Sequence, residues 1–111
     1  MLNQLLKAYR PYKIYKNSQR VINKTTNKED LYFEFSILNN ISCCYATKKE
    51  IAKSCEYIKL ADKELNNILE LFQRSELDYE TRKIETINLH MRMIKLKLQL
   101  CGVYALNIQH V

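Results

Sequence analysis

Glycine and proline are almost missing from this 111-residue chain, which contains only Gly102 and Pro11. Strands and hairpins depend on these residues for their turns, so their scarcity favours helices before any periodicity is considered. A phosphate-binding loop needs several glycines, because its backbone must approach the phosphates closely. A single glycine therefore excludes that class of nucleotide-binding loop.

Metal-binding and disulfide patterns are also missing. The chain has four cysteines: Cys43, Cys44, Cys55 and Cys101. Their spacing fits neither a disulfide framework nor a Cys-x-x-Cys metal knuckle, so we predict reduced thiols packed in the interior. His90 and His110 have no cysteine or carboxylate at a recognised ligand spacing. The sequence therefore predicts no metal site and no cofactor.

Long apolar runs are absent as well. The most apolar stretch, 89–108, is interrupted by Arg92, Lys95 and Lys97, which is too costly for a simple membrane span. The first ten residues are too short and too polar to hold the apolar core of a signal peptide. We therefore expect a cytoplasmic protein without membrane contact.

A catalytic constellation is not apparent either. The carboxylates alternate with lysines along the predicted helices, which is typical of a solvated face, and no nucleophile is paired with a base. We predict no catalytic residue, no enzymatic activity and no small-molecule substrate.

The apolar spacing predicts a helical protein with one domain over residues 1–111, because this length allows one core of three or four elements. Helices are predicted over about 27–45, 48–73 and 76–108, with another before residue 26 that starts or restarts at Pro11. The break near Ala46-Thr47 is either a loop or a bend in one helix. The predicted fold is an all-α, antiparallel three- to four-helix bundle with a long C-terminal helix.

The last predicted helix has apolar residues on two opposite sides. One set, the heptad stripe, repeats at the three-four spacing of a coiled-coil seam and comprises Ile84, Ile87, Met91, Ile94, Leu98, Cys101, Ala105 and Ile108. The other, the second stripe, comprises Leu89, Met93, Leu96, Leu100 and Val103. A bundle needs one stripe per helix, so the other makes this helix central or is covered by another molecule. We predict that the second stripe is an oligomer or partner interface.

The basic residues form two groups, and the net charge of +6 favours a polyanionic partner. The N-terminal group is Lys7, Arg10, Lys13, Lys16, Arg20 and Lys24, interleaved with Tyr9, Tyr12 and Tyr15. The group on the last helix is Arg82, Lys83, Arg92, Lys95 and Lys97. Cations that neutralise phosphates beside rings that stack on bases are typical of single-strand binding. The alternative is a solvated face whose tyrosines pack on the core.

Several motifs follow one another in the second half of the chain. They are Ala61-Asp62, then Leu65, Ile68 and Leu69, a polar break over 75–80, and a helix end at Leu100-Cys101-Gly102-Val103 before Tyr104. This order resembles the four-helix-bundle accessory proteins of diversity-generating retroelements, which are similar to bundles encoded in ribosomal RNA intervening sequences. The resemblance implies a basic helical oligomer that binds nucleic acid and a reverse transcriptase. No individual functional residue is carried over from it.

Together, the residues and the resemblance predict a non-enzymatic accessory protein that forms homo-oligomers and binds nucleic acid, with RNA favoured over DNA. A reverse transcriptase is a partner that the resemblance implies. The alternative is a small phage or mobile-element protein that docks on a host protein as an inhibitor or adaptor through its second stripe.

Overall fold

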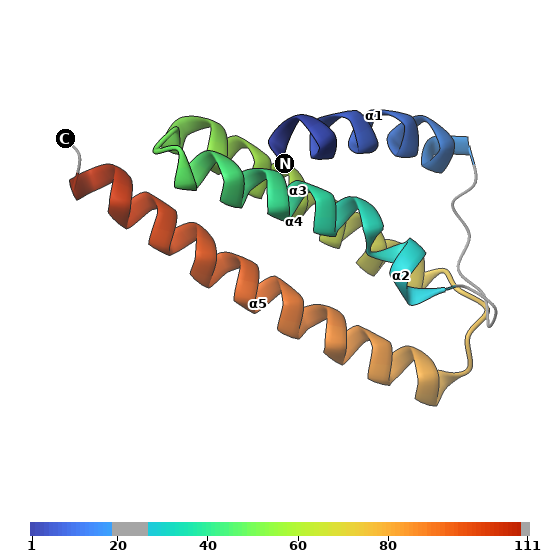
Figure 1. The fold of residues 1–111 in the computed structure, drawn as a ribbon. Helices are drawn as coiled ribbons and strands as arrows, with labels where there is room; N and C mark the ends of the chain where they lie inside the picture. The colour runs from blue at the N-terminus through green and yellow to red at the C-terminus, as the bar shows by residue number, and fades with distance from the viewer. Residues whose placement is uncertain (19–26, 110–111) are drawn as a thin grey trace.

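The residues that the structure describes form five helices. The structure, a computed structural model, describes the backbone of residues 1–18 and 27–109 and the side chains of residues 1–10, 27, 29–103 and 105. The helices are α1 (Leu2–Ser18), α2 (Lys28–Leu31), α3 (Phe33–Thr47), α4 (Ile51–Gln73) and α5 (Tyr79–Gln109) (Figure 1). No strand occurs in these residues, and the predicted all-α class and long C-terminal helix are confirmed.

Two helices differ from their predicted extent. The helix α1 continues through Pro11, which lacks an amide hydrogen but does not end or restart the helix. The helix predicted over 27–45 is divided at Tyr32, which separates the single turn α2 from α3. The Asn27 side-chain oxygen accepts the Glu29 amide hydrogen at 2.8 Å, so Asn27 caps the start of α2.

The break between α3 and α4 is a loop over residues 48–50 and not a bend. Lys49 has a φ of 64°, the left-handed conformation that usually belongs to glycine at a helix end. Its amide donates to the Ala46 carbonyl at 3.0 Å, and the Glu50 amide donates to the Tyr45 carbonyl at 2.9 Å. This pair of hydrogen bonds is the Schellman motif, so backbone geometry ends α3 without a glycine or proline.

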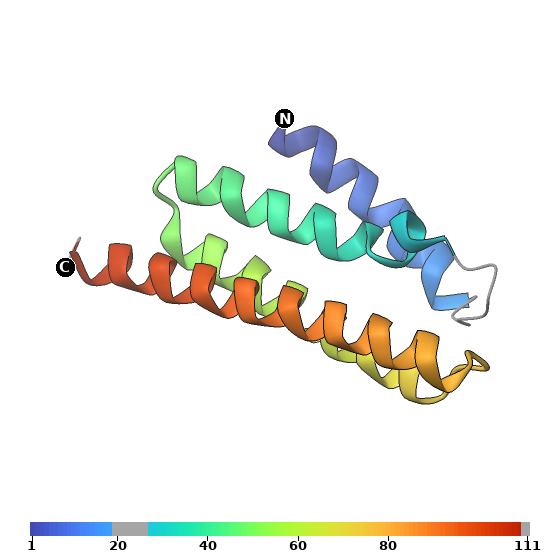
Figure 2. The same ribbon diagram turned by 90° about the horizontal axis from the view of Figure 1, so that it is seen from below.

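The helices pack in succession: α1 lies against α3, α3 against α4, and α4 against α5 (Figures 1 and 2). The structure extends over 49 × 28 × 16 Å, and its radius of gyration is 15.2 Å, against about 13 Å for a compact domain of this length. The arrangement is therefore open. Within the described residues, α4 is the only extended neighbour of α5.

The main core lies between α3, α4 and α5. The central residues of α4 that are fully buried include Ile58, Leu65 and Ile68, and they pack with Leu38 of α3 and Leu89 of α5. These α4 residues recur at spacings of three and seven, so a single face of α4 carries the contacts with both neighbouring helices.

A smaller core joins α1 to α3. Leu2, Leu5, Leu6 and Tyr9 of α1 pack on a buried cluster formed by Ile37, Ile41 and Tyr45, with Tyr57 of α4 beside them. Burial raises the pKa of Tyr9 to about 12, and the nearby Glu34 carboxylate adds to the rise. At least one tyrosine of the N-terminal segment therefore packs on the core, as the alternative reading of that segment expects.

Two buried serines hold α3 against α4. Ser42 and Ser54 are both fully buried, and each hydroxyl oxygen lies 2.9 Å from the carbonyl oxygen of the other residue. The two hydroxyl oxygens are also 2.9 Å apart. Small side chains allow close approach of the two helix backbones here, and the hydrogen bonds satisfy groups that would otherwise be costly to bury.

Candidate interaction surface

The second stripe of α5 lies in the core and not on the surface. Leu89, Leu96 and Val103 are 0%, 2% and 7% exposed, and Met93 and Leu100 are partly buried against the same cluster. These side chains contact α4 within one chain, which leaves them little surface for another molecule. The prediction that they form an oligomer or partner interface is therefore wrong.

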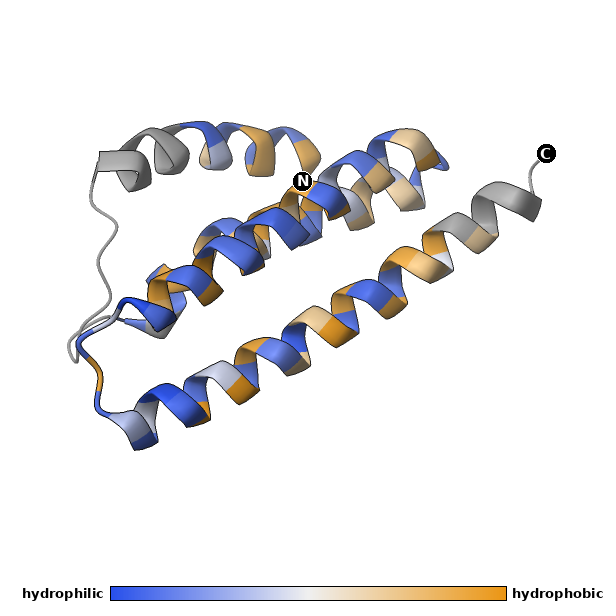
Figure 3. Cartoon of the chain, turned by 180° about the vertical axis from the view of Figure 1, so that it is seen from behind, coloured by the Kyte–Doolittle hydropathy of each residue, from blue (hydrophilic) through white to orange (hydrophobic). Residues whose placement is uncertain are grey.

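The heptad stripe is exposed instead. Its five large members are between 51% and 68% exposed, and they are Ile84, Ile87, Met91, Ile94 and Leu98. Cys101 and Ala105 continue the stripe and are also exposed. Figure 3 shows that apolar residues recur along the coloured part of α5. A contiguous exposed apolar surface of this kind marks an interaction site more often than a surface in permanent contact with water.

The charges beside the heptad stripe explain this orientation. In heptad notation Ile84, Met91 and Leu98 are at position a, which places Lys83, His90 and Lys97 at g and Asn88, Lys95 and Gly102 at e. All six flanking residues are exposed. Packing the heptad stripe on α4 would bring three ammonium groups to the edge of the core. Packing the second stripe there leaves them in water, which is less costly.

Charges are segregated along the chain, and the amino-acid sequence alone contains this signal. All twelve carboxylates lie between Glu29 and Glu85. Residues 1–28 contain seven lysines and arginines, and residues 86–111 contain three, with no carboxylate in either segment. The helix α1 and most of α5 are therefore free of acidic residues. Segments that carry only positive charge attract polyanions.

The two predicted basic groups are not brought together within one chain. In the N-terminal group, Lys7 and Arg10 are exposed on α1. Lys13, Lys16, Tyr12 and Tyr15 have side chains outside the described set, and Arg20 and Lys24 lie outside the described residues. Because α1 packs on α3 and α5 packs on α4, the described members of the two groups, Lys7 and Arg10 on one side and the cations of α5 on the other, lie on different helices of an open array (Figure 2).

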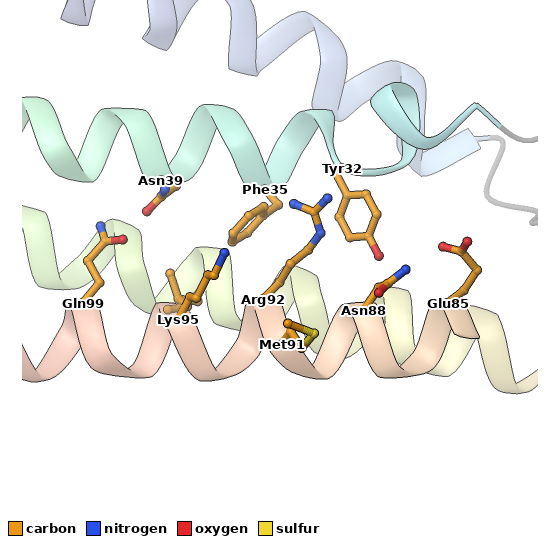
Figure 4. A pocket seen from close by; sticks show the side chains of 10 residues that line it. Tyr32, Phe35, Asn39, Glu85, Asn88, Met91, Arg92, Lys95 and Gln99 are labelled. Carbon is orange, nitrogen blue, oxygen red and sulfur yellow. The ribbon is translucent and has the colours of Figure 1, made fainter. Parts of the chain in front are cut away.

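The basic group of α5 is divided between two sides of the helix. Lys83 and Lys97 are exposed, and Arg82 is partly buried. Arg92 and Lys95 are also exposed, and they line a groove of about 450 Å³ between α3 and α5, where Figure 4 shows them facing Phe35 and Tyr32. The sequence predicted these cations as binding residues but gave no indication of the groove.

Tyr32 and Arg92 form the closest contact across this groove. The Arg92 guanidinium carbon lies 4.1 Å from the centre of the Tyr32 ring, within the range of a cation–π interaction. Burial raises the pKa of the Tyr32 hydroxyl, Arg92 opposes the rise, and Glu85 adds to it. Tyr32 is therefore a neutral, buried phenol near neutral pH.

Neither a protein-family model, nor a curated protein, nor a solved structure matches this chain. The resemblance to retroelement accessory proteins therefore stays a prediction. Function has to be inferred from the surfaces themselves.

The cysteines differ from the predicted buried set. Cys55 is buried and Cys44 is partly buried, but Cys43 and Cys101 are exposed, and all four are free thiols. Among the residues described, no group of three or more histidines, cysteines and carboxylates could hold a metal ion. The described helices also include none that is both long and apolar enough to cross a membrane.

Proposed function

We propose that this protein is a non-enzymatic helical protein that assembles with copies of itself through the heptad stripe of α5 and binds RNA on the assembled surface. One observation carries the proposal: beyond Glu85, α5 combines an exposed heptad stripe with flanking cations and no carboxylate. Self-association covers the stripe, and it also places two sets of cations side by side.

The exposed stripe is large enough to support assembly. Burying the exposed parts of its five large side chains contributes about 4–8 kcal/mol per subunit at the usual value for apolar burial. The loss of translational and rotational freedom on association costs about 4–15 kcal/mol per pair. The free energy of apolar burial from the two subunits together is comparable to this cost. The unbroken three-four spacing also lets two copies interlock as a coiled coil.

The flanking charges couple assembly to RNA. Lys83, Lys95 and Lys97 flank the stripe, so like charges meet across an interface between copies and oppose association. A bound polyanion neutralises them and releases its counterions. We therefore expect RNA to promote assembly, and we expect subunits without RNA to associate more weakly at low salt than at moderate salt.

The alternative partner is another protein. The cationic positions beside the stripe would suit an amphipathic helix whose apolar face is bordered by carboxylates, so the host-docking prediction can be transferred from the second stripe to the heptad stripe. A reverse transcriptase, the partner implied by the resemblance, would fit either proposal. Salt dependence with naked RNA separates direct RNA binding from protein docking.

The test is a titration of labelled structured RNA at low and at physiological salt. We expect affinity to fall steeply as salt rises, because each neutralised phosphate releases counterions. The double variant Lys83→Gln/Lys97→Gln should reduce the affinity and the salt dependence. A matched control, Lys59→Gln/Lys63→Gln, removes two exposed lysines from α4 and should have the smaller effect. No binding at low salt would contradict the proposal.

A further inference from the structure

The groove between α3 and α5 combines features that the stripe and the overall charge do not explain. Tyr32, Phe35 and Asn39 line it from the α3 side, and Arg92, Lys95 and Gln99 line it from α5 (Figure 4). Its lining extends along α5 from residue 85 to residue 99, about 21 Å at the helical rise. The groove is therefore longer than a pocket for one small molecule.

Two buried polar atoms in this lining lack a well-formed hydrogen bond. Among the described residues, the Asn39 side-chain oxygen is shielded from solvent and accepts no hydrogen bond, and the Tyr32 hydroxyl has only the nearby Arg92 guanidinium beside it, without hydrogen-bond geometry. The Tyr32 side chain is only 5% exposed. Buried polar atoms are rarely left without a hydrogen bond, so we expect a bound ligand to supply one at these two positions. The Asn39 oxygen needs a donor, whereas the tyrosine hydroxyl can donate or accept.

Two cations face the same groove. Arg92 and Lys95 are three residues apart on α5, so their side chains project from neighbouring positions of the helix and repel each other. The carboxylate in the lining is Glu85, two helical turns before Arg92 and about 10 Å away along the axis. An anion between the two cations would remove this repulsion.

We propose that the groove binds an unpaired segment of RNA, with a phosphate between Arg92 and Lys95 and a base or ribose donor on the Asn39 side-chain oxygen. A nucleotide has the required combination of an anionic group beside a unit with hydrogen-bond donors and acceptors. A strand fits better than a free nucleotide because the groove runs along two helices and continues the cationic surface of α5. The inference rests on the proposed RNA binding and assigns its single-stranded site.

The test compares a short single-stranded RNA of mixed sequence with the same strand annealed to its complement, by fluorescence anisotropy. Lys95→Gln should weaken single-strand binding about tenfold, because the lysine contacts a phosphate inside the groove. Lys97→Gln is the matched control, since it removes the same charge from the same helix outside the groove. Duplex binding should fall equally in the two variants.

A second pair of variants tests the neutral groups. Tyr32→Phe removes only the hydroxyl and should weaken single-strand binding about three- to tenfold, whereas Tyr79→Phe, at an exposed position outside the groove, should have no effect. Asn39→Ala should act as Tyr32→Phe does. Circular dichroism checks that each variant keeps its helices.

The outcomes separate the two proposals. Single-strand binding that is equally sensitive to groove variants and controls would overturn the groove as the site and leave general RNA binding intact. Absence of RNA binding by the unmodified protein would overturn the proposed function itself. Displacement of the strand by a nucleoside monophosphate at similar affinity would overturn the choice of a strand in favour of a free nucleotide.

Discussion

α4 and α5 are both long helices with apolar residues throughout, yet they differ in how those residues are covered. The helix α4 has one apolar face, and this face packs against two helices, α3 and α5. The helix α5 has apolar stripes on two sides, but α4 is its only extended neighbour among the described residues. The helix with more apolar surface therefore has fewer contacts within the chain.

This difference is the basis of the proposed assembly through α5. An amphipathic helix at the edge of a domain needs one apolar face, and a second face costs solubility unless something covers it. The cations beside the heptad stripe keep the uncovered face hydrated in the free subunit. We infer that the single chain buries the second stripe of α5, and we propose that assembly covers the heptad stripe.

The largest expected effect separates the two stripes of α5. Leu89→Ala should lower the free energy of unfolding by about 2–5 kcal/mol, because it leaves a cavity in a fully buried site. Ile94→Ala should change it by less than about 1 kcal/mol in the separated subunit, because this side chain is mostly in water. Urea unfolding at high dilution measures both values. Equal losses would show that both stripes are in the core.

An intermediate effect is expected between α3 and α4. Ser42→Val should destabilise the protein by about 1–3 kcal/mol, because the larger side chain does not fit between the two helices and leaves the Ser54 hydroxyl with one partner fewer. Ser42→Ala should cost less. Thermal unfolding with both variants distinguishes close packing from hydrogen bonding. A neutral Ser42→Val would show that the two helices are not tightly packed there.

The smallest effect concerns the loop between α3 and α4. Lys49→Gly should stabilise the protein by about 1 kcal/mol, because glycine adopts the left-handed conformation without the steric cost that lysine bears. Chemical denaturation measures the change. Assembly through α5 should be unaffected, since the substitution changes no residue of the heptad stripe. A loss of stability would mean that Lys49 does not adopt this conformation in solution.

The sequence predicted the helices well because their apolar spacing is local information. It did not determine which stripe of α5 faces inwards. Both stripes repeat at three and four residues and contain similar side chains, so periodicity cannot rank them. The feature that decides which stripe packs on α4 is the set of lysines that flank the heptad stripe, because their ammonium groups are costly to bring near a core. The sequence contains this feature, but it is recognised only when the lysines and the apolar stripes are mapped onto the same helix.

Other parts of the candidate site depend on tertiary structure. The groove lies between α3 and α5, where tertiary packing brings Tyr32 and Asn39 opposite Arg92 and Lys95 across a long separation in sequence. No local pattern specifies this pairing. The serine pair between α3 and α4 also depends on tertiary structure. No local sequence pattern predicts that Ser42 and Ser54 will meet, because the loop between the helices brings them together.

The most direct test is the oligomeric state measured by sedimentation velocity across protein concentrations, with and without RNA. The unmodified protein should associate, and Ile87→Glu/Ile94→Glu should be monomeric with unchanged helical content, because both positions are exposed in the single chain and lie outside the groove lining. Leu60→Glu, at an exposed position of α4, is the control and should still associate. A monomeric unmodified protein at all concentrations, with RNA present or absent, would contradict assembly through the heptad stripe.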